Sequence, residues 1–97
     1  RVGAGVKGAA RQWVEVHYLG WLDGGRVVAS SSPRGKTISF GLNQVIRGWT
    51  EGMQLVGEGG MIELEIPSDL GYGARGAGGV IPGNATLHFL VDLIKVR

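Results

Sequence analysis

Hydrophobic and polar residues alternate in several stretches of the chain, beginning at residues 14–18 (VEVHY). A period of two is typical of a β-strand that buries one of its faces. The triplet Asp23-Gly24-Gly25 that follows is typical of a turn. Residues 27–28 can begin a second strand, and residues 38–40 form a third short extended piece, with a loop between them.

The period changes in the stretch 45–56 (VIRGWTEGMQLV), where apolar residues recur at spacings of three and four. This spacing gives a helix one apolar face, and Gly57 is a suitable residue to end it. Gly48 and Gly52 each weaken a helix by roughly 1 kcal/mol relative to alanine. We therefore expect packing to stabilise this helix, with the two glycines allowing close approach to a sheet.

Strand periodicity returns in residues 61–66 (MIELEI) and 86–96 (TLHFLVDLIKV), on either side of a Gly-rich loop. Strands without intervening crossover helices indicate antiparallel pairing. The sequence therefore predicts an α+β fold, in which a curved antiparallel sheet wraps around one short helix. We expect a single domain over residues 1–97, with the Gly/Ala-rich residues 1–11 as a lead-in.

Composition narrows the classes of function. The 97 residues include no cysteine, which excludes disulfides and thiol chemistry. The net charge of +2 comes from scattered basic residues and gives no reason to expect nucleic acid. No apolar run approaches the roughly 20 residues of a membrane span. The compartment stays open, since cytoplasm and periplasm both fit, and the initial Arg1 is typical of an excised or processed piece.

Candidates for acid–base, metal and nucleotide chemistry have simpler explanations. His17 and His88 each fall on the outward face of a predicted strand, with no third metal ligand at suitable spacing. Glu63 and Glu65 share the polar face of another strand. Residues 71–76 (GYGARG) match the dinucleotide-binding spacing, but glycines and a proline follow instead of a helix. We expect no metal and no cofactor.

A set of aromatic and aliphatic residues remains: Tyr18, Phe40, Val45, Ile46, Trp49, Tyr72, Ile81 and Phe89. Most such residues belong to a hydrophobic core. Tyr72 and Ile81, however, lie in the Gly-rich loop, where an apolar residue must find a surface to cover. Trp49 lies on the only predicted helix of a small domain, where it can form the floor of a concave pocket.

Four motifs in this order resemble FK506-binding (FKBP) domains. Residues 16–24 (VHYLGWLDG) resemble the V-H-Y-x-G-x-L-x-D-G opening, and residues 45–52 (VIRGWTEG) are similar to the V-I-x-G-W-x-E-G helix entry. Residues 66–73 (IPSDLGYG) resemble I-P-x-x-L-A-Y-G, and residues 81–87 (IPGNATL) resemble I-P-P-N-A-T-L. The resemblance extends from about Gly5 to Val96 and implies a peptidyl-prolyl cis-trans isomerase.

The resemblance also implies a set of site residues. The catalytic set is Tyr18, Ile46, Trp49, Tyr72 and Phe89, and the substrate-binding set is Val28, Ala29, Arg34, Ile38, Val45, Val80 and Ile81. Trp49 is expected beneath the proline ring, while the Ile46 N–H and the Tyr72 hydroxyl bind substrate carbonyls. The implied partners are proline-containing client polypeptides and macrolides such as FK506 or rapamycin.

Three positions depart from the family pattern. Val28 and Ala29 stand where the family has a pocket phenylalanine and a pocket aspartate, and Gly83 replaces the second proline of the loop. The first two changes remove an aromatic wall and a carboxylate. A second hypothesis is therefore a non-catalytic or weakly active prolyl-binding or chaperone module of a larger protein.

Overall fold

The structure, a computed structural model, describes residues 3, 5, 9, 12–31 and 37–97, so most of the predicted lead-in 1–11 lies outside it. Five strands form one antiparallel sheet, in the order β2-β1-β5-β4, and β3 pairs with another part of β1. The strands are β1 (Trp13–Leu22), β2 (Val27–Ser30), β3 (Ile38–Gly41), β4 (Met61–Ile66) and β5 (Leu87–Val96).

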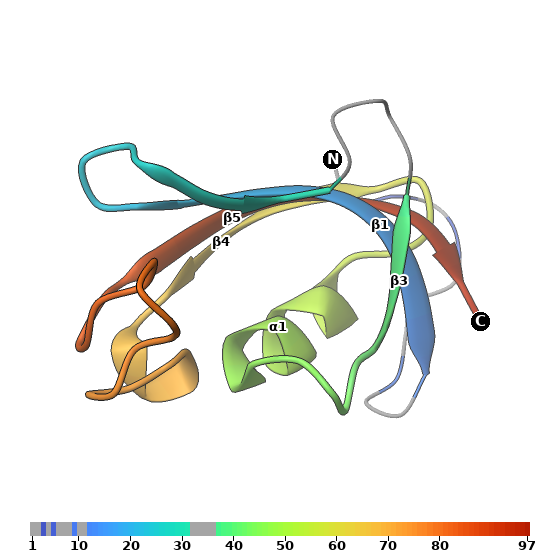
Figure 1. The fold of residues 1–97 in the computed structure, drawn as a ribbon. Helices are drawn as coiled ribbons and strands as arrows, with labels where there is room; N and C mark the ends of the chain where they lie inside the picture. The colour runs from blue at the N-terminus through green and yellow to red at the C-terminus, as the bar shows by residue number, and fades with distance from the viewer. Residues whose placement is uncertain (1–2, 4, 6–8, 10–11, 32–36) are drawn as a thin grey trace.

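The sheet curves, and its concave side faces the short helix α1 (Arg47–Gly52), as Figure 1 shows. A 3₁₀ turn, η1 (Met53–Leu55), follows α1 directly, and a second one, η2 (Ser68–Leu70), begins the loop before β5. This arrangement confirms the predicted α+β fold, a curved antiparallel sheet around one short helix.

The first and last strands lie side by side at the centre of the sheet. Nine residue pairs join β1 to β5, and the register shifts once, between Glu15 and Val16. At one end of this pair, the Trp13 N–H donates to the Arg97 carbonyl at 3.1 Å, and the Arg97 N–H donates to the Trp13 carbonyl at 2.8 Å. Backbone hydrogen bonds therefore join the first residue of β1 to the residue that follows β5.

The alternation predicted for β5 is confirmed. Leu87, Phe89, Val91 and Leu93 are buried on the concave side, whereas Leu90 between them is exposed. Period-two patterning decides which side chains reach the core, because successive residues of a strand point to opposite faces. Apart from Trp49 and Phe89, the buried core is made of aliphatic residues and Met: Val14, Val16, Leu42, Met53, Val56, Leu64, Ile66, Leu87, Val91 and Leu93.

The helix is shorter than the predicted 45–56. Ile46 has an extended backbone, with ψ at 150°, so α1 begins at Arg47, and the final turn tightens into η1. Two glycines in so short a helix disfavour longer α-helical structure. Their predicted role in close approach is confirmed, because a Cβ added at Gly48 or Gly52 would lie 2.5 Å from side chains of β4. Thr50 Oγ1 also donates to the Leu42 carbonyl at 2.5 Å.

No helix among residues 12–31 and 37–97 combines the length and the apolar composition that crossing a membrane requires.

Candidate active site

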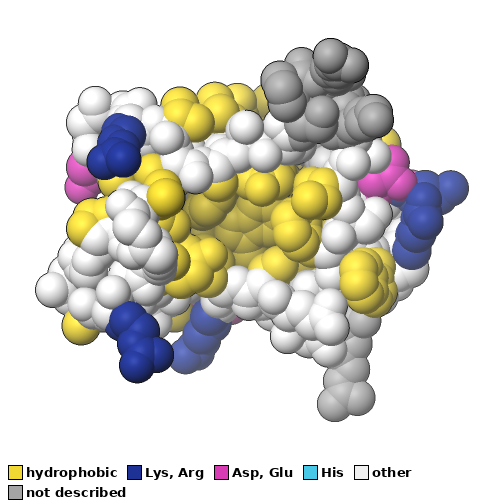
Figure 2. Space-filling model, viewed as in Figure 1, with side chains coloured by type: hydrophobic (Ala, Val, Ile, Leu, Met, Phe, Trp, Pro, Cys, Tyr) yellow, Lys and Arg dark blue, Asp and Glu magenta, His cyan; other side chains and the backbone are white. Residues whose placement is uncertain are grey.

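A hollow of about 430 Å³ opens on the concave side of the sheet, next to the N-terminal end of α1. In Figure 2 it is the apolar depression at the centre of the view. The lining comes from four strands, the helix and the segment before it, and the loop before β5. Its residues are Tyr18, Val28, Ala29, Phe40, Gln44, Val45, Ile46, Trp49, Tyr72, Ile81 and Phe89.

Trp49 lies at the base of this pocket and is 4% exposed. Its indole meets three other rings edge to face: Tyr18 at 5.5 Å, Phe40 at 5.5 Å and Phe89 at 5.3 Å between centroids. Edge-to-face pairs of this kind each add about 0.5–1.5 kcal/mol beyond the area that they bury. Trp49 is therefore held rigidly, with rings from β1, β3 and β5 around it.

The wall next to β2 is built from small residues. Ala29 lies opposite Gly20 of β1, and the register shifts between Gly20 and Trp21, where Val28 is the extra residue of β2. A Cβ added at Gly20 would lie 2.5 Å from Phe89 Cε1. The absence of a side chain at Gly20 therefore leaves room for the Phe89 ring beside β1.

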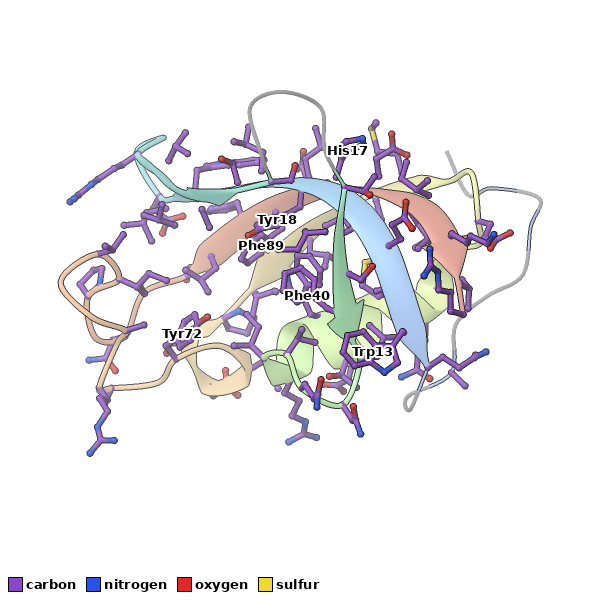
Figure 3. The ribbon with its side chains drawn as sticks, turned by 45° about the vertical axis from the view of Figure 1, so that its right-hand side comes forward. Trp13, His17, Tyr18, Phe40, Tyr72 and Phe89 are labelled. Atoms are coloured by element: carbon purple, nitrogen blue, oxygen red, sulfur yellow. The ribbon has the colours of Figure 1, made fainter. Side chains whose placement is uncertain are left out.

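Tyr72 and Ile81 reach the pocket from the loop between β4 and β5, and both line the apolar hollow. The loop is fixed internally by a bridge, in which the Ala77 N–H donates to the Ile81 carbonyl at 2.9 Å and the Ile81 N–H donates to the Ala77 carbonyl at 3.1 Å. Tyr72 remains 41% exposed, at the rim of the pocket. Figure 3 shows its ring on the loop below the sheet.

None of the eleven lining residues is Asp, Glu, His, Lys or Arg. Burial raises the pKa of the Tyr18 phenol above its usual value, and the charge of the nearby Tyr72 phenolate would raise it further. Tyr18 is therefore a neutral phenol at physiological pH. Among the described residues, none accepts a hydrogen bond from the Ile46 N–H, which lies at the start of the helix.

The structure brings nine of the twelve sequence-predicted site residues into one pocket: Tyr18, Val28, Ala29, Val45, Ile46, Trp49, Tyr72, Ile81 and Phe89. Ile38 and Val80 lie outside its lining and are 39% and 45% exposed. Arg34 lies outside the described residues. Two lining residues were absent from the predicted site. Phe40 stood out in the sequence only as an apolar residue, and no sequence signal marked Gln44.

The two histidines lie away from the pocket, on the outer face of the sheet. In Figure 3, His17 lies on the side of the sheet opposite the helix, whereas Tyr18, the next residue, lies beneath it. His88 contacts Asp23 at 2.6 Å and stacks on Trp21. Across the described part of the chain, His, Asp and Glu side chains nowhere gather in threes that could hold a metal ion.

An apolar hollow with an aromatic floor and few polar groups is the usual form of a ligand-binding site. A family model described as FKBP-type peptidyl-prolyl cis-trans isomerase matches residues 6–94. The chain is 51% identical over 96 residues to an FK506-binding protein of Neisseria meningitidis serogroup A, an alignment that covers 97% of this chain and 88% of that protein.

Solved structures agree with this match. FkpA from Escherichia coli superposes with a TM-score of 0.94 and 42% identity, over 99% of this chain and 45% of that one. A peptidyl-prolyl cis-trans isomerase from Pseudomonas syringae pv. tomato superposes with a TM-score of 0.92 and 40% identity, over 98% and 69%. The chain belongs to the FKBP-type peptidyl-prolyl cis-trans isomerase family and is an enzyme of that class.

Proposed function

We propose that the pocket receives the proline ring of client polypeptides and accelerates rotation about the preceding peptide bond, without a covalent intermediate. The observation that carries this proposal is the position of Trp49, a buried indole floor ringed by Tyr18, Phe40 and Phe89. A pyrrolidine is a compact apolar ring that can lie on such a floor. The lining offers it dispersion contacts and no charge.

The pocket's polarity suits the chemistry of amide rotation. A planar amide resists rotation by about 18–20 kcal/mol because its C–N bond has partial double-bond character. The twisted transition state has lost this resonance and is less charge-separated than the planar ground state. An apolar pocket that excludes water therefore disfavours the ground state more than the transition state, and this difference accelerates the reaction.

We assign the orientation of the bound client polypeptide to two polar groups at the edge of the pocket. The Ile46 N–H is without an acceptor among the described residues, and Ile46 lines the pocket, where its carbonyl accepts the Trp49 N–H at 3.0 Å. The Tyr72 hydroxyl lies on a partly exposed ring at the rim. We assign both to hydrogen bonds with carbonyls of the client on either side of its proline, while Val28, Ala29, Val45 and Ile81 line the remaining walls.

Refolding of a client whose slow phase is limited by proline isomerisation tests this function. Uncatalysed X-Pro exchange takes tens to hundreds of seconds, so we expect catalytic amounts of this domain to shorten the phase several-fold. FK506 should remove the acceleration and raise the melting temperature of the domain, because a ligand that binds only the folded state stabilises it. Acceleration that saturating FK506 leaves unchanged would contradict a role for this pocket.

A second candidate function is prolyl-peptide binding or chaperone action with little catalysis. The specific observation is the β2 wall, where Val28 and Ala29 supply neither a ring nor a carboxylate to the pocket. The two functions differ in the refolding assay. Rates restored toward those of relatives by Ala29→Asp indicate a weakened enzyme. Client aggregation that is suppressed without any change in the slow phase indicates a binding module.

A further inference from the structure

The outer face of the sheet, which points away from the helix and the pocket, carries an apolar strip. Directly opposite residues of neighbouring antiparallel strands share a face. Leu19 of β1 lies opposite Leu90 of β5, and Trp21 lies opposite both Val27 and His88. A shallow groove of about 420 Å³ runs along this face. We name as the outer strip the residues Leu19, Trp21, Val27, Met61 and Leu90.

Three of these side chains are strongly exposed for apolar residues. Leu19, Leu90 and Val27 leave 39%, 37% and 56% of their surface accessible. Leu19 and Leu90 lie directly opposite each other, and Trp21, two residues along β1 from Leu19, lies opposite Val27, so the patch extends over three strands. A contiguous exposed apolar patch with a polar border is typical of an interaction site, whereas isolated exposed apolar residues are common on any protein.

Carboxylates border the outer strip. Glu63 lies opposite Leu90, Glu65 opposite His88, and Asp92 opposite both His17 and Met61. Together with Asp23, these are four of the chain's eight acidic residues. The outward positions of β1 from His17 on, of β4 and of β5 up to Asp92 include no Lys or Arg. Arg26 lies in the adjoining turn, at one end of the strip.

Two of the border carboxylates, those of Asp23 and Glu65, contact the same histidine. Asp23 Oδ1 lies 2.6 Å from His88 Nε2, and the His88 ring stacks on Trp21 at 5.8 Å with planes 13° apart. Glu65 Oε1 lies 4.0 Å from the other ring nitrogen of His88. The side chains of Asp23 and Glu65 are nevertheless 75% and 76% exposed. Both carboxylates can therefore contact a partner while they hold the ring.

We propose that the outer strip is a docking surface for a basic, amphipathic polypeptide segment. Its apolar side chains would cover Leu19, Leu90 and Val27, and its Lys and Arg side chains would lie over the carboxylate border. Charge complementarity selects this partner. The four carboxylates would repel an anionic lipid or a nucleic acid. A second copy of the chain would place its own four carboxylates against these four, and the two sets would repel each other.

Binding of a synthetic peptide of Leu and Lys tests the proposal. The peptide has about 18 residues, so that it can form a stable helix, with leucines on one face and no proline. A matched peptide has Glu at every Lys position. We expect micromolar binding of the Leu/Lys peptide by fluorescence anisotropy, weakened by salt, and no binding of the Leu/Glu peptide at the same concentrations.

Variants assign the binding to the outer strip. Leu19→Ser/Leu90→Ser should weaken binding about tenfold, because less apolar surface is buried. Glu63→Gln/Glu65→Gln should weaken binding and flatten its dependence on salt. Leu55→Ser is the matched control, since Leu55 is 65% exposed but lies on η1. All variants should keep the isomerase activity, and their melting temperatures show whether they fold.

Four results would overturn the proposal. One is equal affinity in the folded Leu19→Ser/Leu90→Ser variant and the unaltered chain. Another is binding of the Leu/Glu peptide as tight as that of the Leu/Lys peptide. Displacement of the peptide by FK506 would place it in the pocket instead. Concentration-dependent dimers that the double serine variant abolishes would make a second copy the occupant.

Discussion

Two parts of the concave side of the sheet differ in how they are filled. In one part, aliphatic side chains and Met53 form a buried core, and Val16, Met53 and Leu93 have no exposed surface. Next to it, the four rings of Tyr18, Phe40, Trp49 and Phe89 surround a cavity. One sheet thus supports both a packed core and an open pocket.

The two parts differ in the shape of their side chains and not in polarity, because both are apolar. Branched and flexible aliphatic chains adapt to one another and fill space, as protein interiors require. Aromatic rings are rigid, and those of Tyr18 and Phe89 are each held edge to face against Trp49. The mutual contacts of the rings therefore help to hold the walls of the pocket in place.

The largest expected effect is on catalysis, and it distinguishes the floor of the pocket from the packed core. Trp49→Leu removes the floor, and we expect kcat/KM for a prolyl tetrapeptide to fall on the order of a hundredfold, because misplacement of the bound ring by about 1 Å has that effect. Met53→Ala is the control in the packed part. It should lower the free energy of unfolding by about 2–5 kcal/mol.

Activity assays at a temperature where both variants are folded complete this test. Met53→Ala should then keep kcat/KM within about twofold of the unaltered chain, although it is the less stable protein. An equal loss of kcat/KM in the two variants would show that activity follows stability, and the distinction between floor and core would be wrong.

The next effect concerns the contact between the helix and the sheet. A Cβ added at Gly48 would lie within 2.8 Å of three side-chain atoms of Ile66, a β-branched residue that cannot easily move aside. Gly48→Ala should therefore destabilise the fold by about 1–3 kcal/mol through overpacking, despite the better helix propensity of alanine. Chemical denaturation measures this, and an increase in stability would show that the helix can move away from β4.

A smaller effect should come from the wall of the pocket. Alanine at Gly20 would place a Cβ 2.5 Å from Phe89 Cε1 and push the ring into the cavity. We expect kcat/KM to fall about tenfold, the equivalent of about 1.4 kcal/mol in the barrier. Gly79→Ala is the matched control, because its Cβ would meet nothing within 4 Å. Equal activity in the two variants would show that Phe89 can turn without closing the pocket.

The smallest effect concerns pH. Desolvation raises the pKa of Tyr18 in the folded state above its unfolded value near 10. A raised pKa makes a contribution to stability that is fully present below about pH 10 and is lost as pH rises through the folded-state pKa. Denaturation at increasing pH above 10 should therefore show a shallower decline for Tyr18→Phe than for the unaltered chain. Parallel declines would contradict the assignment.

The strands could be predicted from the sequence because burial alternates along them. Leu87, Phe89, Val91 and Leu93 recur at every second position, and each is buried. The helix was predicted with the right apolar face but too long, since periodicity does not reveal where Ile46 leaves helical geometry. Local patterning thus specifies which face is buried more reliably than where an element begins.

The pocket was less predictable because it depends on loops. Val80 and Ile81 are adjacent and chemically alike, yet only Ile81 lines the pocket, since the bridge to Ala77 fixes which of them turns inward. No period in the sequence encodes that choice. Gln44 likewise reaches the lining because the connection from β3 to α1 passes the cavity.

The pairing of β1 with β5 has a consequence for biosynthesis. The ribosome makes these two partners at opposite ends of the described chain, and Phe89, which closes one side of the pocket, belongs to the later strand. A nascent chain that ends before β5 has neither the centre of its sheet nor a complete cavity. Among the described strands this pairing joins the segments farthest apart in the sequence, and folding must wait for it, so the enzyme cannot work until β5 has been translated.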